Sequence, residues 1–170
     1  MNSNKNIVFL GMMGSGKSSI GTLVSKKLNI PFIDIDYLIE EHAGMSISEI
    51  FKNNGEDYFR NLEEKITLKT LKNNKSVIAL GGGGFINDKI RKDILLKHFS
   101  FWLDWDESIL LKRIRGSKKR PLAFKSTDKE IKAIIKKRAK IYSKAQFKIN
   151  CNKLTKTEII NKIIKIYELN

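Results

Sequence analysis

The sequence GMMGSGKS, which runs from Gly11 to Ser18, decides the fold of this chain. It fits the pattern G-x-x-x-x-G-K-[ST], in which glycines let the backbone bend so that several N–H groups point at one phosphate. The apolar run 7–10 before it is typical of a buried strand, and the amphipathic run 18–28 after it is typical of a helix. Strand, loop and helix in this order predict a nucleotide-phosphate site at the start of the helix.

Two side chains of this loop have separate expected roles. Lys17 is expected to reach the β- and γ-phosphates of ATP, and Ser18 is expected to hold Mg²⁺. The alternative is a glycine-rich turn that binds nothing. The strand before the loop and the helix after it favour the phosphate site, because they supply the context in which this pattern works.

Composition sets the class of protein. With 170 residues, 41% of them hydrophobic and 30% charged, residues 1–170 are expected to form one soluble globular domain. No apolar run approaches the roughly 20 residues that a membrane span needs, and residues 1–6 do not read as a signal peptide. Cys151 is the only cysteine, so no intramolecular disulfide can form and a reducing cytoplasm is the expected location.

The net charge of +15 is unevenly distributed, since residues 112–148 hold 15 Lys and Arg against only two acids, Asp128 and Glu130. Such a segment can bind nucleic acid or a membrane surface, surround a polyanion such as ATP, or simply form a solvated face. No aromatic interleaving and no known nucleic-acid motif accompany it. We therefore expect neither a nucleic acid nor a membrane as partner.

Five apolar runs alternate with helical patterns along the chain. The expected strands are 7–10, 32–36, 76–80, 99–104 and 147–151. This alternation predicts an α/β fold with a parallel sheet covered by helices on both faces. The basic run 115–126 contains Gly and Pro and shows no period, and a loop of this length is expected to be a mobile lid.

Asp34 and Asp36 close the second expected strand. Alternate strand positions share a face, and ligands bind at the carboxyl ends of parallel strands. One carboxylate is therefore expected to anchor Mg²⁺ and the other to orient a substrate hydroxyl. In the alternative, Asp36 caps a helix that begins at Tyr37 and Asp34 is merely solvated.

Three further features have two interpretations each. Arg60 can hold a substrate carboxylate, but its spacing also suits an ion pair with Glu63 on a wet helix face. The four glycines at 81–84 after a strand let the backbone approach another group closely, or they form a loose turn. Asp104 after the fourth strand can position a metal, although acids are ordinary turn residues.

Together these pieces resemble the shikimate kinases, small relatives of the nucleoside monophosphate kinases. The matching pieces are the loop 11–18 with Ser19, Asp34-Ile35-Asp36, Phe59-Arg60-x-x-Glu63, Leu80-Gly81-Gly82-Gly83, Arg120-Pro121-Leu122 and Arg138-x-x-x-Tyr142. The resemblance implies the P-loop NTPase fold, with a five-stranded parallel sheet in the order 2-3-1-4-5. It also implies that ATP phosphorylates the 3-hydroxyl of shikimate on the route to chorismate and the aromatic amino acids, and that the protein is a monomer.

The resemblance assigns a role to each matching residue. Shikimate is expected to be bound by Asp36, Arg60, Gly81, Gly82, Gly83 and Arg138. ATP is expected to be bound by Gly14, Ser15, Gly16, Lys17, Ser18, Ser19, Arg113 beside the adenine, and Arg120. Catalysis is expected from Lys17, Asp36 and Arg120 of the lid, and Mg²⁺ is expected at Ser18 and Asp34. Two rival functions are another small-molecule kinase of this fold and a nucleotide-dependent binder of nucleic acid.

Overall fold

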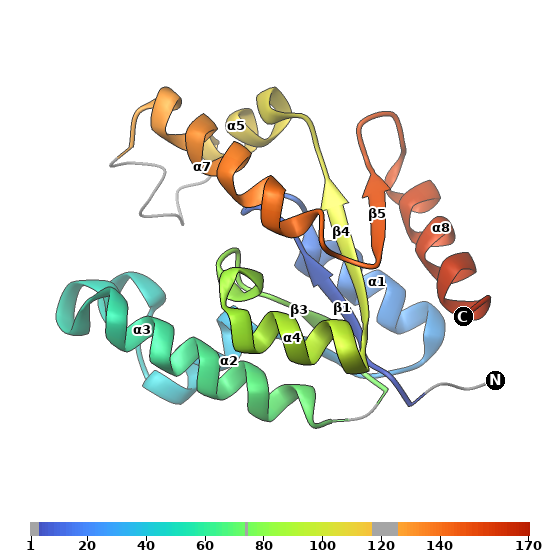
Figure 1. Cartoon of the computed structure of the whole chain (residues 1–170), viewed down its shortest axis with the longest axis horizontal. Coiled ribbons are helices and arrows are strands. Elements are labelled where there is room, and N and C mark those ends of the chain that lie inside the picture. The colour runs from blue at the N-terminus through green and yellow to red at the C-terminus, as the bar shows by residue number, and fades with distance from the viewer. Residues whose placement is uncertain (1–3, 74, 117–125) are drawn as a thin grey trace.

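A five-stranded parallel sheet forms the centre of the protein, as a computed structural model that describes residues 4–73, 75–116 and 126–170 shows (Figure 1). The strands are β1 Ile7–Leu10, β2 Phe32–Asp34, β3 Val77–Ala79, β4 Phe99–Asp104 and β5 Phe147–Asn150. Their order across the sheet is β2-β3-β1-β4-β5, and all pairs are parallel. The predicted α/β class and strand order are confirmed.

Helices cover both faces of this sheet (Figure 1). They are α1 Lys17–Leu28, α2 Ile35–Ala43, α3 Ile47–Leu71, α4 Asp88–Lys97, α5 Glu107–Arg115, α7 Asp128–Tyr142 and α8 Lys156–Glu168, with a 3-10 turn, η1, at Gly84–Ile86. Successive β1 residues point to opposite faces. Ile7 and Phe9 join the apolar cluster that includes side chains of α1 and α8, whereas Val8 and Leu10 join the cluster beneath the other helices.

The second strand is shorter than predicted. The expected strand 32–36 is wrong at its end, because β2 stops at Asp34 and α2 begins at Ile35. The Asp34 side chain caps α2 by accepting a hydrogen bond from the Asp36 backbone N–H at 3.1 Å. The cap is therefore Asp34 and not Asp36, since an aspartate directly before a helix satisfies an otherwise unpaired N–H group.

Other helix boundaries follow local signals, with one exception. Ser46 and Glu49 form a capping box at the start of α3, and the Asn87 side chain caps α4. Asp106 precedes α5, but its side chain makes no capping hydrogen bond. Within α3, two helical segments meet at a kink at Gly55, whose φ of 84° is not helical, a conformation that glycine adopts at little cost.

Within the described residues, no helix is both long and apolar enough to cross a membrane. Cys151 is fully buried, as expected for a small apolar side chain in the core. Its burial raises the pKa of the thiol to about 12. The thiol is therefore inert at neutral pH.

Candidate active site

The phosphate-binding loop lies between β1 and α1, at the carboxyl edge of the central strand. Gly16 caps α1 with a φ of 89°, and the Lys17 ammonium donates to the carbonyls of Gly11 and Met12 at 2.9 and 3.1 Å. A cleft of about 340 Å³ opens over this loop. It is lined by Met13, Gly14, Gly16, Lys17, Ser18, Ser19, Asp34, Asp36, Leu80 and Gly82. The predicted nucleotide residues of the loop, except the buried Ser15, therefore face one cavity.

Ser18 and Asp34 lie together in this cleft. The Ser18 hydroxyl donates to Asp34 Oδ2 at 2.5 Å. Hydroxyl and carboxylate oxygens are the hard ligands that Mg²⁺ prefers, and this ion keeps several waters and phosphate oxygens as its other ligands. The pair therefore suits Mg²⁺, although no group of three or more His, Cys, Asp or Glu side chains in the described part of the chain is arranged to hold a metal.

The Asp36 carboxyl group is the most perturbed acid of the site. Burial raises its pKa to about 6; the charge of Lys17 opposes this shift, while those of Asp34 and Glu63 add to it. A methyl group added at Gly81 would lie 2.5 Å from Asp36 Oδ1 and 2.7 Å from Glu63 Oε1. Gly81 is therefore needed for the two acids to approach the backbone so closely.

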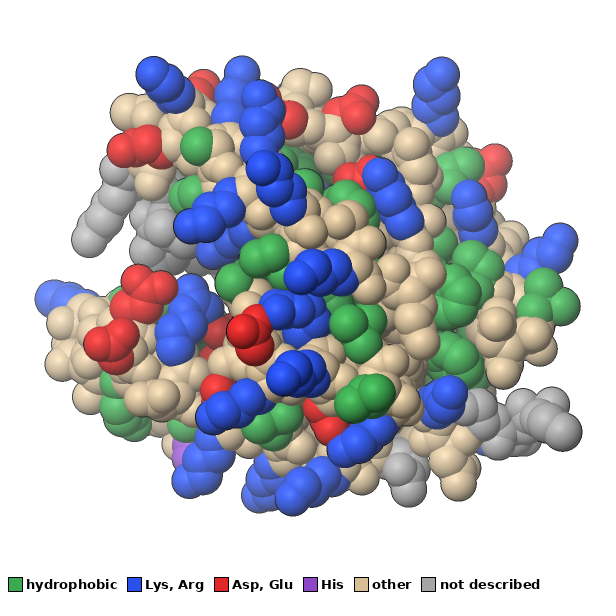
Figure 2. Space-filling view, viewed as in Figure 1, with side chains coloured by type: hydrophobic (Ala, Val, Ile, Leu, Met, Phe, Trp, Pro, Cys, Tyr) green, Lys and Arg blue, Asp and Glu red, His purple; other side chains and the backbone are tan. Residues whose placement is uncertain are grey.

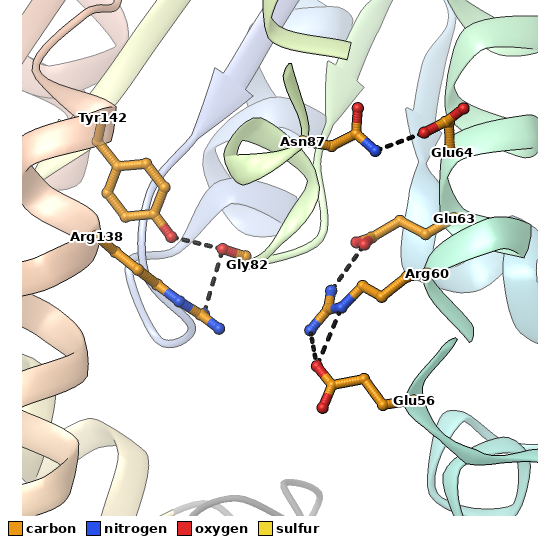
Figure 3. Close-up of polar contacts among 8 residues, drawn as sticks. All are labelled: Glu56, Arg60, Glu63, Glu64, Gly82, Asn87, Arg138 and Tyr142. Atoms are coloured by element: carbon orange, nitrogen blue, oxygen red, sulfur yellow. Dashed lines mark hydrogen bonds and ion pairs between the residues drawn. The ribbon is translucent and has the colours of Figure 1, made fainter. Parts of the chain in front are cut away.

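A second cleft, of about 420 Å³, lies between α3, η1 and α7. Arg60 lines it from α3, and Arg138 lines it from α7. Figure 3 shows the two guanidinium groups pointing toward the same space from opposite sides. Sequence spacing alone could not place them together, because 78 positions separate the two residues and only the fold closes that distance.

Arg60 makes the ion pair that its spacing suggested, but in a different environment. Its Nη1 lies 2.7 Å from Glu63 and its Nη2 lies 3.2 Å from Glu56. The Glu63 side chain is only 3% exposed, so the pair lies at the wall of the cleft and not on a wet helix face. The ion pair orients the guanidinium. Arg60 can therefore make this ion pair and still hold a substrate carboxylate.

The glycine loop is held by α7 (Figure 3). The Gly82 carbonyl accepts hydrogen bonds from Tyr142 Oη at 2.5 Å and from Arg138 Nη1 at 3.3 Å. A methyl group at Gly83 would overlap Arg60 Nη1. The loose-turn interpretation is wrong, since close approach explains the glycines at 81 and 83. Sequence reasoning missed the contact of Tyr142, although its position one turn after Arg138 was a usable signal.

Arg113 and Trp105 contact the backbone of the phosphate loop and line neither cleft. The Arg113 guanidinium lies over the Trp105 ring, 3.8 Å from its centroid, and donates to the Gly14 carbonyl at 3.3 Å. Trp105 Nε1 donates to the Ser15 carbonyl at 2.9 Å. Trp105 had no predicted role. Asp104 pairs with Lys148 at 3.0 Å and lines neither cleft, so its metal-positioning interpretation is not favoured.

Arg120 and most of the predicted lid lie outside the described residues. At the borders of this segment, Arg115 donates to the Ser126 carbonyl and to Asp128, each at 2.7 Å. These contacts hold Arg115 close to Ser126, the two residues that bound the predicted lid 115–126.

Basic residues are dispersed on one face of the protein. Figure 2 shows Lys and Arg side chains across one face, with Asp and Glu side chains between them. Within the basic segment 112–148, Lys132 and Lys136 both lie within 4 Å of Glu107. This dispersed arrangement fits the solvated-face interpretation better than a single polyanion-binding patch.

Comparison with known proteins identifies relatives over nearly the whole chain. The family model described as shikimate kinase matches residues 13–168. A shikimate kinase of Thermodesulfovibrio yellowstonii is 41% identical over 165 residues, which cover 96% of this chain and 95% of the relative.

Two solved structures are also similar. The crystal structure of shikimate kinase from Aquifex aeolicus has 36% sequence identity and a TM-score of 0.86, with 96% of each chain covered. Shikimate kinase from Acinetobacter baumannii in complex with shikimate has 27% identity and a TM-score of 0.91, with 98% of this chain and 94% of that chain covered.

Proposed function

The chain belongs to the shikimate kinase family, and from this premise we propose that it transfers the γ-phosphoryl group of ATP to the 3-hydroxyl of shikimate. The products are 3-phosphoshikimate and ADP, on the route to chorismate and the aromatic amino acids. The main support for the proposal is the position of Asp36 between the two clefts. Asp36 lines the phosphate cleft and also approaches Glu63, which lines the second cleft. A hydroxyl beside Asp36 is therefore close to both a triphosphate and a carboxylate site.

Arg60 and Arg138 bind the shikimate carboxylate in this proposal. A planar guanidinium offers two parallel N–H donors that match a carboxylate, which a lysine cannot do. Arg60 is already oriented by Glu56 and Glu63. The backbone of Gly81, Gly82 and Gly83 forms the floor on which the ring lies.

Asp36 orients the attacking hydroxyl and accepts its proton. A carboxyl group with a pKa near 6 is ionised at pH 7.5, yet more basic than an ordinary aspartate. Catalysis of phosphoryl transfer rests on positioning and on neutralising charge. The Lys17 ammonium supplies one positive charge, and the backbone N–H groups of Gly14, Gly16 and Ser19 surround the phosphates, while the Ser15 N–H donates to the Met12 carbonyl at 3.1 Å.

Mg²⁺ bound at Ser18 and Asp34 supplies further positive charge to the β- and γ-phosphates. The donor set supports this assignment, because the two side chains already lie in contact at 2.5 Å. We also propose a cytoplasmic monomer. Arg60, Gly82, Arg138 and the phosphate loop all come from one chain, so a second copy is not required to build the site.

The test is a coupled ADP-release assay with Mg-ATP. Shikimate is expected to stimulate ADP release strongly, whereas quinate, AMP and gluconate are not. Turnover with one of these three and none with shikimate would retain the kinase and reject the substrate. If all four were inactive, retention on a DNA column at physiological salt would support the nucleic-acid alternative.

Lysine substitutions at the two arginines test the carboxylate site. Arg60→Lys and Arg138→Lys keep the charge but lose the two-pronged geometry. Each is expected to raise the KM for shikimate about 10- to 100-fold, corresponding to a charged hydrogen bond of about 1.5–3 kcal/mol. The KM for ATP is expected to stay within about twofold, since neither side chain lines the phosphate cleft.

The matched control for these variants is Arg91→Lys. Arg91 also donates to backbone carbonyls, those of Phe85 and Ile86, but it lines neither cleft. Its KM values are expected to stay near those of the unmodified protein. A rise in the KM for ATP alone, in either cleft variant, would show that the carboxylate assignment is wrong.

A further inference from the structure

Trp105 bridges two parts of the nucleotide site. It follows β4 directly, at the carboxyl edge of the sheet, and its partly buried ring packs against both apolar clusters. From this anchored position its Nε1 donates to the Ser15 carbonyl at 2.9 Å, and its face lies under Arg113. One rigid side chain thus contacts both the phosphate loop and a surface cation.

The hydrogen bond to Ser15 fixes the direction of a backbone amide. A trans peptide is planar, so the Ser15 C=O and the Gly16 N–H lie in one plane and point in opposite directions. When Trp105 holds the carbonyl, it also sets where the Gly16 N–H points. Gly16 caps α1 and lines the phosphate cleft, which makes its amide a donor for a bound phosphate.

Arg113 fixes the neighbouring peptide in the same way. Its Nη1 donates to the Gly14 carbonyl at 3.3 Å while its guanidinium lies 3.8 Å from the Trp105 ring centroid. One face of the guanidinium is thus covered by indole, yet Arg113 as a whole is exposed. The resemblance to the shikimate kinases implies adenine beside Arg113, and a flat cation held on one face offers its other face to such a base.

We propose that Trp105 is a positioning residue of the nucleotide site that couples the phosphate loop to Arg113. It orients the Gly16 amide through the Ser15 carbonyl, and it holds the Arg113 guanidinium flat, so that the base of a nucleotide stacks on the outer face. The proposal rests on the proposed function only in taking ATP as the nucleotide. It requires no assumption about the phosphate acceptor.

Two substitutions separate the two actions of Trp105. Trp105→Phe keeps an aromatic face under Arg113 but removes the N–H group. Trp105→Leu removes both. The control is Trp102→Phe, which changes the other tryptophan of the chain; Trp102 packs near Tyr142 and lines neither cleft. Calorimetric titration with Mg-ADP and with Mg-pyrophosphate then distinguishes base from phosphate binding.

Trp105→Phe is expected to weaken Mg-ADP and Mg-pyrophosphate equally, about fivefold, the effect of one lost hydrogen bond. Trp105→Leu is expected to weaken pyrophosphate by the same factor and ADP by about a further two- to fivefold, the effect of the lost cation–π contact. The KM for shikimate is expected to stay within about twofold in both variants.

The Trp102→Phe variant adds a spectroscopic readout that a merely structural tryptophan would not give. Trp105 is then the sole indole, and its emission is expected to change when Mg-ADP binds but not when shikimate binds alone. Thermal unfolding of each variant shows whether it is folded.

The inference would be overturned if both Trp105 variants bound both ligands within about twofold of the unmodified protein. It would also be overturned if the variants weakened shikimate as much as ADP, since that result would indicate general loss of structure. Failure of the proposed function would give a different result from failure of this inference. Shikimate would not stimulate ADP release in the unmodified protein, while the Trp105 variants would still bind ADP more weakly.

Discussion

Lys17→Met is expected to reduce shikimate-dependent ADP release by at least about 10³-fold. Methionine keeps the length of the side chain but removes the ammonium group. The transferred phosphoryl group spreads negative charge over its oxygens, and a positive charge positioned in advance stabilises that arrangement. Lys17 lines the phosphate cleft and projects from the first turn of α1, so no neighbouring side chain takes its place.

The control for this variant is Lys26→Met. Lys26 lies on the same helix, but it is exposed and lines neither cleft, so its ADP release is expected to be unchanged. Far-UV circular dichroism of both variants shows whether α1 is intact. A folded Lys17→Met variant that retained more than about a tenth of the activity would refute the charge-neutralising role of this lysine.

Asp36→Asn is the second change with a large expected effect. Asparagine cannot accept a proton from the substrate hydroxyl, so kcat is expected to fall about 10²- to 10⁴-fold. The KM for ATP is expected to change little, because the amide occupies nearly the same space. Steady-state kinetics with both substrates varied measures the two effects separately. A variant with an unchanged kcat would show that the carboxylate only orients the hydroxyl.

The pH dependence of the unmodified enzyme tests the same carboxylate. Asp36 must be ionised to accept a proton, and its pKa is about 6. The kcat/KM for shikimate is therefore expected to rise with pH through about 6 and then to level off. If the rate stayed constant from pH 5 to about 7.5, another group would be the base.

The same substitution is expected to stabilise the protein at neutral pH. The pKa of Asp36 rises from 3.8 to about 6 on folding, so its contribution to stability is full below pH 3.8 and is lost as the pH rises through about 6. Asparagine stays neutral and avoids that loss.

Denaturant unfolding at pH 8 is expected to show a gain of about 1–2 kcal/mol for Asp36→Asn, a value that allows for the partial exposure of the side chain. Near pH 4 the difference is expected to be small. A variant that was less stable than the unmodified protein at pH 8 would contradict the raised pKa.

The alternation of strands with helices and the phosphate loop could be predicted because short-range patterns encode them, whereas the strand order was implied only by the resemblance to the shikimate kinases. Each strand is an apolar run, and the residues of the loop are contiguous in sequence. The end of β2 could not be placed, because Asp34 suits a strand end and a helix cap equally well. The capping hydrogen bond to the Asp36 N–H decided in favour of the helix.

The contacts that complete the site were beyond sequence reasoning for a different reason. Tyr142 and Gly82, and likewise Trp105 and Ser15, are joined only by the tertiary fold. Aromatic residues at helical spacing or after a strand usually fill the core. The spacing of Tyr142 from Arg138 was the one local signal, and nothing in the local sequence of Trp105 shows that its side chain also holds a functional backbone group.

The position of β1 has a consequence for the synthesis of the chain. Its register joins Ile7 to Val77 and to Phe99, so its partners follow about 70 and 90 residues later. At ~5–20 residues per second, a ribosome exposes the apolar run Ile7–Leu10 for several seconds before either neighbour emerges. The segment that organises the finished enzyme is thus the one that most needs chaperone protection in the nascent chain.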